Sequence, residues 1–347
     1  APVADVNINT DNPVINTRSF GEDPVKVADK VIAYASGLES GKVLSVCKHF
    51  PGHGDTDVDS HKALPVLPFT RERLDSVELY PFKEAIRAGV SGMMVGHLQV
   101  PVIEPIGDLP SSLSRNVVYG LLTEELAFKG LIFTDALAMK GVAGNKSVCL
   151  QALQAGNDMV LAPRRLKEEM DAVLEAVEKG ELPEEEINAK CRKVLTYKYI
   201  LGLERKPFVK LSGLGTRINT PQTRDLISRL NLAAITVLNN KNDVLPLHPD
   251  LKEAAILNVG KPEEIEPFDR KMKKYTSFAR FQLRKDLPEA EQQKLRDSLA
   301  AYRRVIVTVT EQRLAPYQSF FAKFAPESPV IYVFYLSLIH ISEPTRH

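Results

Sequence analysis

The sequence has no tryptophan, only three cysteines and no long apolar run. No apolar stretch reaches the roughly 18 residues that a transmembrane helix needs. The cysteines, Cys47, Cys149 and Cys191, are far apart and lack the spacing of a metal site. Each falls in an apolar or amphipathic segment, so we interpret all three as small core residues.

An excess of charge of either sign is also missing. Lysine and arginine number 45 and acidic residues 44, so the formal net charge is +1, and the two signs alternate along the chain. A nucleic-acid partner normally needs a concentrated basic surface, so we expect none. The 347 residues suggest about two domains, although one α/β barrel can take up roughly 250 residues.

The two ends of the chain look unusual. The sequence begins at Ala1 without methionine, and APVADVN already has the pattern of a strand that runs into an Asn-rich loop, so it leaves open whether a signal peptide preceded it. Near the other end, the buried-strand pattern PVIYVFY is followed by LSLIHISEPTRH, which matches no turn or helix. We predict that residues 336–347 are a non-native tail, such as translated adapter sequence.

The first two hundred residues alternate short apolar runs with amphipathic stretches. Helices are predicted from about Arg115 to Leu126, with Val117, Val118, Leu121 and Leu122 on one face, and from Pro183 to Gly202, with Ile187, Cys191, Val194 and Leu195 buried. Such alternation favours a parallel sheet covered by helices. The predicted strands are Pro2–Val6, Val43–Cys47, Gly92–Gly96, Gly130–Thr134 and Asp158–Leu161.

Polar side chains stand at the carboxyl ends of four of these runs. They are Asp5 and Asn7, Lys48 and His49, His97, and Asp135. Active groups at several strand ends are typical of a (β/α)8 TIM-type barrel, but five strands are counted where a barrel needs eight. We therefore predict an α/β protein whose barrel, residues 1–205, lacks its first strands in this chain.

A second α/β unit is predicted after the barrel. Residues 206–222 have the composition of a linker, and Pro221 can begin a helix. Residues 223–335 then contain three buried-strand patterns and are predicted to be a partial α/β sandwich domain. These patterns are Ala254–Val259, Val305–Thr310 and Val330–Phe334.

The densest group of reactive side chains is KHFPGHGDTDVDSH, residues 48–61. Gly52 and Gly54 allow tight turns, so its polar groups can converge. Asp59 and His61 form an Asp-x-His pair, in which a carboxylate raises the pKa of an imidazole and makes it a proton donor near neutral pH. Two other interpretations remain open: a solvated pair without a role, and a metal site using histidines and aspartates of the loop, although no known metal-ligand spacing is present.

A second segment, GLIFTDALAMKGV at residues 130–142, ends an apolar run in Thr134 and Asp135. An aspartate held there between apolar neighbours is suited to act as a carboxylate nucleophile. The alternative is that Asp135 caps the next helix.

These two segments resemble the signatures of the β-N-acetylglucosaminidases of glycoside hydrolase family 3. Further matching segments are APVADVN, NPVINTRSFGEDP at 12–24, MMVGH at 93–97 and AGNDMVLAP at 155–163. The resemblance is close over residues 1–205 and looser through NLAAITVLNNKNDVLPL at 231–247. Lys-His-Phe is shared across the family, whereas PGHG followed by Asp-Ser-His marks the N-acetylglucosaminidase branch.

The resemblance implies a catalytic set and a substrate. Asp135 matches the nucleophile, His61 the general acid/base and Asp59 its partner, while Lys48, His49 and Arg18 match residues that bind the sugar. It implies hydrolysis of terminal β-linked N-acetylglucosamine, with peptidoglycan (muropeptide-type) fragments as substrate and neither metal nor cofactor. A retaining reaction needs two such groups flanking the glycosidic bond. For localisation the bacterial periplasm or envelope is favoured, with the cytoplasm as the alternative.

The resemblance also places three barrel strands before APVADVN. We expect the chain by itself to be unstable or inactive, because an open parallel sheet exposes apolar faces and unpaired edges. Three other functions stay open: a family 3 β-glucosidase, which would normally take its acid from the second domain, a metal-dependent hydrolase, and a non-catalytic sugar-binding module.

Overall fold

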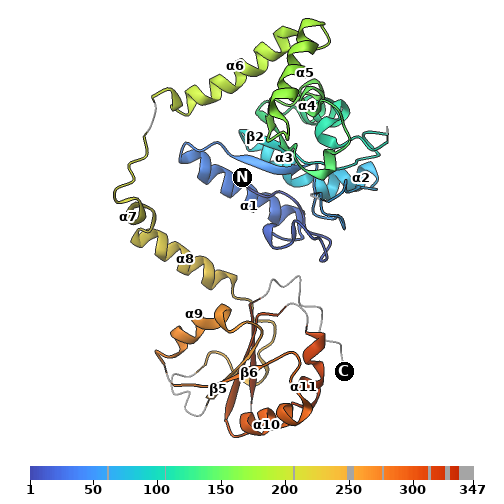
Figure 1. Cartoon of the computed structure of the whole chain (residues 1–347). Coiled ribbons are helices and arrows are strands. Elements are labelled where there is room, and N and C mark those ends of the chain that lie inside the picture. The colour runs from blue at the N-terminus through green and yellow to red at the C-terminus, as the bar shows by residue number, and fades with distance from the viewer. Residues whose placement is uncertain are drawn as a thin grey trace. The chain divides into compact units, whose positions relative to one another are not determined.

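The computed structural model describes residues 1–60, 62–105, 107–205, 208–247, 254–275, 277–311, 314–324 and 329–335. The predicted acid/base His61 and the predicted tail, 336–347, lie outside these residues. The chain forms two compact units, Ala1–Phe208 and a second that begins at Val209 (Figure 1). No described helix is long and apolar enough to cross a membrane.

The sheet of the first unit has four parallel strands in the order β1-β2-β3-β4. Apolar runs at the predicted places form all four, which confirms the α/β class with a parallel sheet. The first of them lies three residues later than predicted, since Val43 closes the preceding helix by donating its N–H to the Leu38 carbonyl. The strands are β1 (Val46–Phe50), β2 (Gly92–Val95), β3 (Leu131–Ala136) and β4 (Met159–Leu161).

The predicted strand Pro2–Val6 is present only as one parallel bridge, between Val3 and Lys48. The Ala4 N–H donates to the Lys48 carbonyl at 2.6 Å. The next N–H of β1, that of His49, bonds to the side chain of Asp5. The prediction of a regular strand was wrong, although Ala4 and Val6 are buried as expected.

Helices cover this sheet and form its core. The segment predicted from Arg115 to Leu126 is a π-type helix whose four predicted apolar residues are at most 2% exposed. Buried side chains of α1, α3 and this helix join one cluster with those of the sheet. The helices of the first unit are η1 (Asn16–Arg18), α1 (Pro24–Ser40), α2 (Arg71–Arg73), η2 (Leu74–Glu78), α3 (Tyr80–Arg87), η3 (Ser111–Leu113), η4 (Asn116–Glu125), η5 (Lys140–Val142), α4 (Val148–Ala155), α5 (Leu166–Glu178), α6 (Glu184–Ile200) and η6 (Leu203–Arg205).

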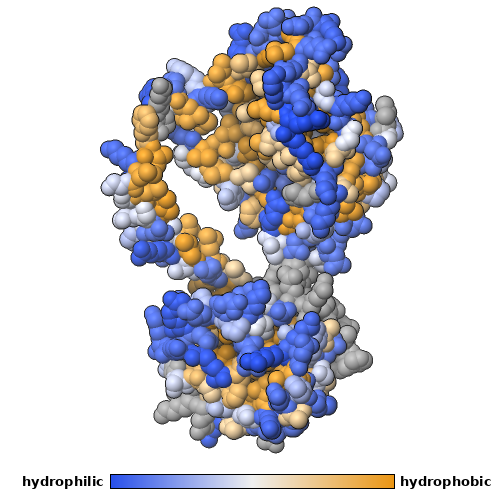
Figure 2. Space-filling view, in the orientation of Figure 1, coloured by the Kyte–Doolittle hydropathy of each residue, from blue (hydrophilic) through white to orange (hydrophobic). Residues whose placement is uncertain are grey.

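Helix α6 corrects one prediction. It begins after Pro183 and ends before Gly202, as expected, but none of its residues is buried. Leu195 is 56% exposed and Cys191 is an exposed free cysteine rather than a core residue. Helical spacing defines an apolar face without supplying a partner for it. Figure 2 shows apolar side chains gathered along this helix.

The predicted linker contains more structure than expected. A short helix, α7 (Leu214–Ile218), lies within it. Helix α8 (Pro221–Ala234) begins at the predicted proline, where the Thr220 hydroxyl accepts from the Thr223 N–H. A Pro in the first turn and a Thr cap are typical helix starts, which the sequence pattern therefore located correctly.

The second unit has its own parallel sheet, in the order β6-β5-β7-β8. Alternate residues of the two central strands face opposite ways, so one side packs against α10 and α11 and the other against α9. The sequence prediction missed the edge strand β6, since ARFQL carries an exposed Arg280. The elements are η7 (Lys241–Asp243), β5 (Ala254–Val259), α9 (Pro262–Met272), β6 (Ala279–Leu283), α10 (Glu289–Ala300), β7 (Arg304–Val309), η8 (Ala315–Tyr317), α11 (Gln318–Lys323) and β8 (Val330–Phe334).

Candidate active site

Predicted site residues gather at the carboxyl edge of the first sheet. Lys48 and His49 lie near the carboxyl end of β1, just before its last residue, Phe50. Asp135 is the last residue but one of β3. Parallel strands end at the same edge, so side chains from separate parts of the sequence share it. The strand that separates them, β2, ends two residues before His97.

Asp5 organises the centre of this edge. Its carboxylate is fully buried and accepts the N–H of His53 at 2.7 Å and that of His49 at 3.1 Å through Oδ1. Its Oδ2 lies 2.7 Å from Nδ1 of His49. Burial by itself would raise the pKa of Asp5, but the electrostatic interactions and hydrogen bonds that its carboxylate makes with His49 and His53 together hold that pKa below its ordinary value. Asp5 therefore stays ionised at neutral pH.

Sequence reasoning placed Asp5 at a strand end but did not assign it to the site. Its partners are 44 and 48 residues away, and only the folded chain shows the contact. The available signal was its place near the end of the predicted strand Pro2–Val6, which comes directly before the predicted strand that leads to Lys48 and His49.

The loop after β1 is held by backbone contact and by buried side chains. A Cβ on Gly54 would lie 1.9 Å from the Val6 carbonyl oxygen, so no other residue fits between the loop and the N-terminal segment. The His53 ring lies 2.6 Å from the Thr56 hydroxyl and 3.0 Å from the Ser60 hydroxyl. Asn12 donates to the His53 carbonyl at 2.8 Å. The loop that carries the predicted acid/base is thus fixed as far as Ser60.

Asp59, the predicted partner of His61, is partly exposed one residue before Ser60. Its backbone carbonyl accepts the N–H of Lys62 at 2.8 Å, and its carboxylate lies 4.0 Å from the Lys62 ammonium. The geometry of the Asp59–His61 pair is not among the described contacts, because His61 lies outside them.

Arg18 and Lys48 flank His49. Arg18 is exposed, donates to the Val14 carbonyl at 3.2 Å and has Nη2 3.5 Å from Nε2 of His49. Lys48 is partly exposed, and its backbone bonds to Pro2 and Ala4. The exposed guanidinium of Arg18 therefore lies at the solvent side of the buried imidazole of His49, and Lys48 precedes His49 in β1.

Asp135 is half-buried, and its Oδ1 accepts the N–H of Ala136 at 2.7 Å. The alternative interpretation, a helix cap, is wrong because the strand continues through Ala136 and the next helix begins at Lys140. Burial lowers the pKa of the His53 ring, and the nearby charges of Asp5 and, to a smaller extent, Asp135 oppose this lowering. Asp135 therefore lies at the same carboxyl edge of the sheet as Lys48 and His49 of β1.

His97, which the sequence placed at a strand end without a role, supports this edge. Its ring is buried, with Nδ1 2.7 Å from the Ser112 hydroxyl and Nε2 3.1 Å from the Ala136 carbonyl. Because a carbonyl only accepts, Nε2 carries the hydrogen. The ring therefore holds the residue next to Asp135.

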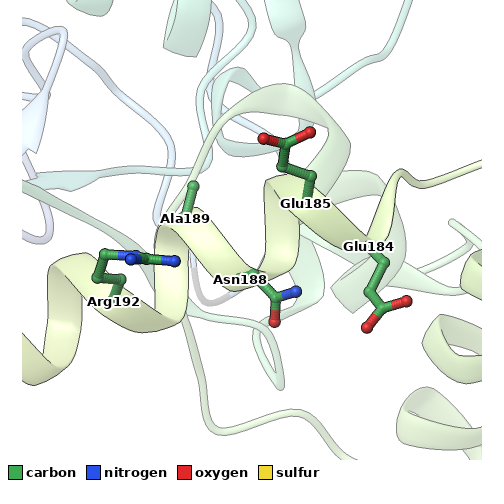
Figure 3. A pocket seen from close by; sticks show the side chains of 5 residues that line it. All are labelled: Glu184, Glu185, Asn188, Ala189 and Arg192. Atoms are coloured by element: carbon green, nitrogen blue, oxygen red, sulfur yellow. The ribbon is translucent and has the colours of Figure 1, made fainter.

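Two further observations concern metal binding and surface cavities. Within the described ranges, no three His, Cys, Asp or Glu residues are grouped so as to hold a metal ion. A surface hollow of about 500 Å³ lies along α6, lined by five exposed residues that include Glu184 and Arg192 (Figure 3). None of the strand-end residues lines it.

Comparison with known proteins gives one family. The profile of the glycosyl hydrolase family 3 N terminal domain matches residues 1–197. Beta-hexosaminidase A of Pseudoalteromonas piscicida is 35% identical over 71% of this chain and 44% of its own length. The Beta-N-acetylglucosaminidase/beta-glucosidase of Cellulomonas fimi is 28% identical over 71% of this chain and 46% of its own.

A solved structure is similar over almost the whole chain. The glycoside hydrolase family 3 beta-N-acetylglucosaminidase from Paenibacillus sp. str. FPU-7 is 31% identical with a TM-score of 0.79, covering 96% of this chain and 66% of that one. The chain spans about half the length of the curated relatives it matches.

Proposed function

Because this chain belongs to glycosyl hydrolase family 3, we propose that it carries the catalytic groups of a retaining exo-β-N-acetylglucosaminidase. The substrate class is a terminal, non-reducing β-linked N-acetylglucosamine, and peptidoglycan fragments are the natural source. The observation that carries the proposal is the position of Asp135, half-buried at the carboxyl end of β3, at the edge of the sheet where β1 ends with Lys48, His49 and Phe50.

The proposed reaction proceeds in two displacements. The Asp135 carboxylate attacks the anomeric carbon and forms a glycosyl ester, while His61 gives its proton to the departing glycosidic oxygen. His61 then takes a proton from water, which attacks the same carbon and releases Asp135. Asp59 orients His61, and Arg18, Lys48 and His49 bind the sugar hydroxyls.

Two features of the site support this chemistry. The N–H of Ala136 holds Oδ1 of Asp135 at 2.7 Å, which leaves the other carboxylate oxygen for attack. An imidazole as acid/base also leaves the site with one carboxylate at the anomeric carbon instead of two. The C. fimi relative, whose name includes beta-glucosidase, favours β-glucosides as the second candidate substrate class.

The test uses the natural protein that contains this chain. We expect an activated 2-deoxy-2-fluoro glycoside, which forms a slowly hydrolysed glycosyl ester, to add one fluorosugar mass to the peptide that contains Asp135. Asp135→Asn should lower kcat by roughly 10³-fold or more, since the covalent step is lost. Asp171→Asn, at an exposed ion pair with Lys167, is the matched control and should keep normal turnover.

Two results would contradict the proposal. One is normal turnover in the Asp135→Asn variant, and the other is sugar attached to a different residue. Faster hydrolysis of para-nitrophenyl β-glucoside than of the corresponding N-acetylglucosaminide would favour the second substrate class.

A further inference from the structure

Asp5 binds the side chain of His49 in addition to the backbone of the loop. Holding the loop backbone in place would not require the bond to the side chain. Two of its contacts, to the N–H groups of His49 and His53, hold the main chain through Oδ1. Oδ2 lies 3.3 Å from the same backbone nitrogen of His49 and, at the shorter distance of 2.7 Å, from its ring nitrogen Nδ1. The fully buried carboxylate of Asp5 therefore forms a hydrogen bond with the imidazole of His49 at the proposed sugar site.

The groups next to the two ring nitrogens of His49 indicate which nitrogen carries the hydrogen. A carboxylate only accepts, so Nδ1 of His49 carries the hydrogen. On the other side, Nε2 lies 3.5 Å from Nη2 of Arg18, and a guanidinium only donates. A hydrogen on Nε2 would place a donor against a donor, so Nε2 presents a lone pair.

The two nitrogens form a matched donor and acceptor. An oxygen about 2.8 Å from each of them fits, because Nε2 of His49 and Nη2 of Arg18 are only 3.5 Å apart. A hydroxyl group both donates and accepts, so it satisfies both nitrogens at once.

We propose that Asp5 is a positioning residue that fixes His49 as the Nδ1–H tautomer, so that His49 Nε2 and Arg18 together bind one hydroxyl of the sugar. The sugar half of this inference rests on the proposed function. Asp5 itself touches no substrate and acts through His49.

The variant Asp5→Asn separates this role from loop anchoring. Its Oδ1 can keep both backbone bonds, while its amide NH2 replaces Oδ2 and donates to Nδ1 of His49. The hydrogen of the ring then moves to Nε2. Asp158→Asn is the matched control. The side chain of Asp158 is also buried, and it accepts from the backbone N–H of Ile132 and from the Lys193 ammonium. It does not contact His49.

The first measurement is the nitrogen-15 NMR spectrum of the histidine rings, with the signals of His49 identified by their loss in His49→Asn. We expect the Nδ1–H form in the parent protein and in Asp158→Asn, and the Nε2–H form in Asp5→Asn. The same tautomer in Asp5→Asn as in the parent would overturn the inference.

The second measurement compares aryl N-acetylglucosaminide with its 3-, 4- and 6-deoxy analogues in the natural protein that contains this chain. Removing one of these hydroxyls should lower kcat/KM by about 10- to 100-fold in the parent, since a charge-assisted bond is lost. In Asp5→Asn that penalty should fall below about 3-fold, and in a His49→Ala background Asp5→Asn should add nothing.

The outcomes distinguish the two levels of the argument. If the tautomer changes but the loss of kcat/KM for the deoxy analogues does not, Asp5 has no part in binding the sugar hydroxyl. If no N-acetylglucosaminide is turned over at all, the proposed function fails and the sugar half of the inference fails with it. An unchanged tautomer overturns the inference alone.

Discussion

At the scale of single residues, the strand-end network is held by buried groups that must keep one protonation state. His53 is 2% exposed, and its ring lies against the hydroxyls of Thr56 and Ser60. Burial lowers its pKa below the ordinary 6.5 and nearby His49 adds to this, while the charges of Asp5 and Asp135 partly oppose it. The folded protein therefore prefers neutral His53.

This preference makes stability depend on pH. Since the folded-state pKa of His53 lies below that of the unfolded chain, the unfolded state takes up its proton first as the pH falls. The contribution of neutral His53 to the free energy of unfolding is fully present above about pH 6.5. It is lost as the pH falls below that value, with a slope of at most about 1.4 kcal/mol per pH unit. We expect urea unfolding of the first unit to show this loss between pH 7.5 and 5.5.

The variant His53→Gln serves as the control, because its amide does not titrate. Its stability should change less over the same window, even if it is lower throughout. Asp5 does not interfere, since its own titration lies below 3.8. Equal slopes in the parent and the variant would show that His53 is not the titrating group.

At the scale of elements, two helices of the first unit with similar apolar patterns differ in burial. In η4, Leu121 is 2% exposed and belongs to the main core cluster. In α6, Leu195 is 56% exposed. The contribution of a leucine to stability follows the area it buries, not its helical spacing.

The same substitution in both helices tests this difference. We expect Leu121→Ala to lower the free energy of unfolding by about 2–5 kcal/mol, because it leaves a cavity. Leu195→Ala should change it by less than about 0.5 kcal/mol, as for other surface positions. Chemical denaturation of the natural protein that contains this chain measures both, and a large loss in Leu195→Ala would mean that α6 is covered in solution.

At the scale of the whole molecule, each unit has its own core. Leu257 in β5 is fully buried in a cluster that also includes side chains of α10 and α11. The first unit has separate clusters around its own sheet and around α4. Units with their own cores are expected to open independently.

Leu257→Ala therefore should affect the second unit alone. A cavity worth about 2–5 kcal/mol corresponds to amide exchange that is roughly 30-fold faster or more in the core of that unit. Hydrogen exchange followed by mass spectrometry, resolved by peptide, measures both units in one sample. Faster exchange in β1–β3 as well would show that the two units open together.

Much of the fold could be predicted from the sequence, because its signals are local. Apolar runs located four strands of the first sheet, and the pairs Lys48–His49 and Thr134–Asp135 were placed at strand ends because each directly follows or closes such a run. Helix starts at Pro183 and Pro221 followed from proline and capping patterns. These features depend on neighbours within a few residues.

What only the tertiary structure decided depends on distant contacts. The bond between Asp5 and His49 joins residues 44 positions apart, and the predicted strand Pro2–Val6 pairs with β1 at one bridge only. Likewise, exposure of Cys191 and Leu195 depends on what lies over α6, which helical spacing does not specify. Hydrogen bonds and burial depend on the partners that folding brings together, so a single sequence determines where a side chain points along its own element but not what meets it there.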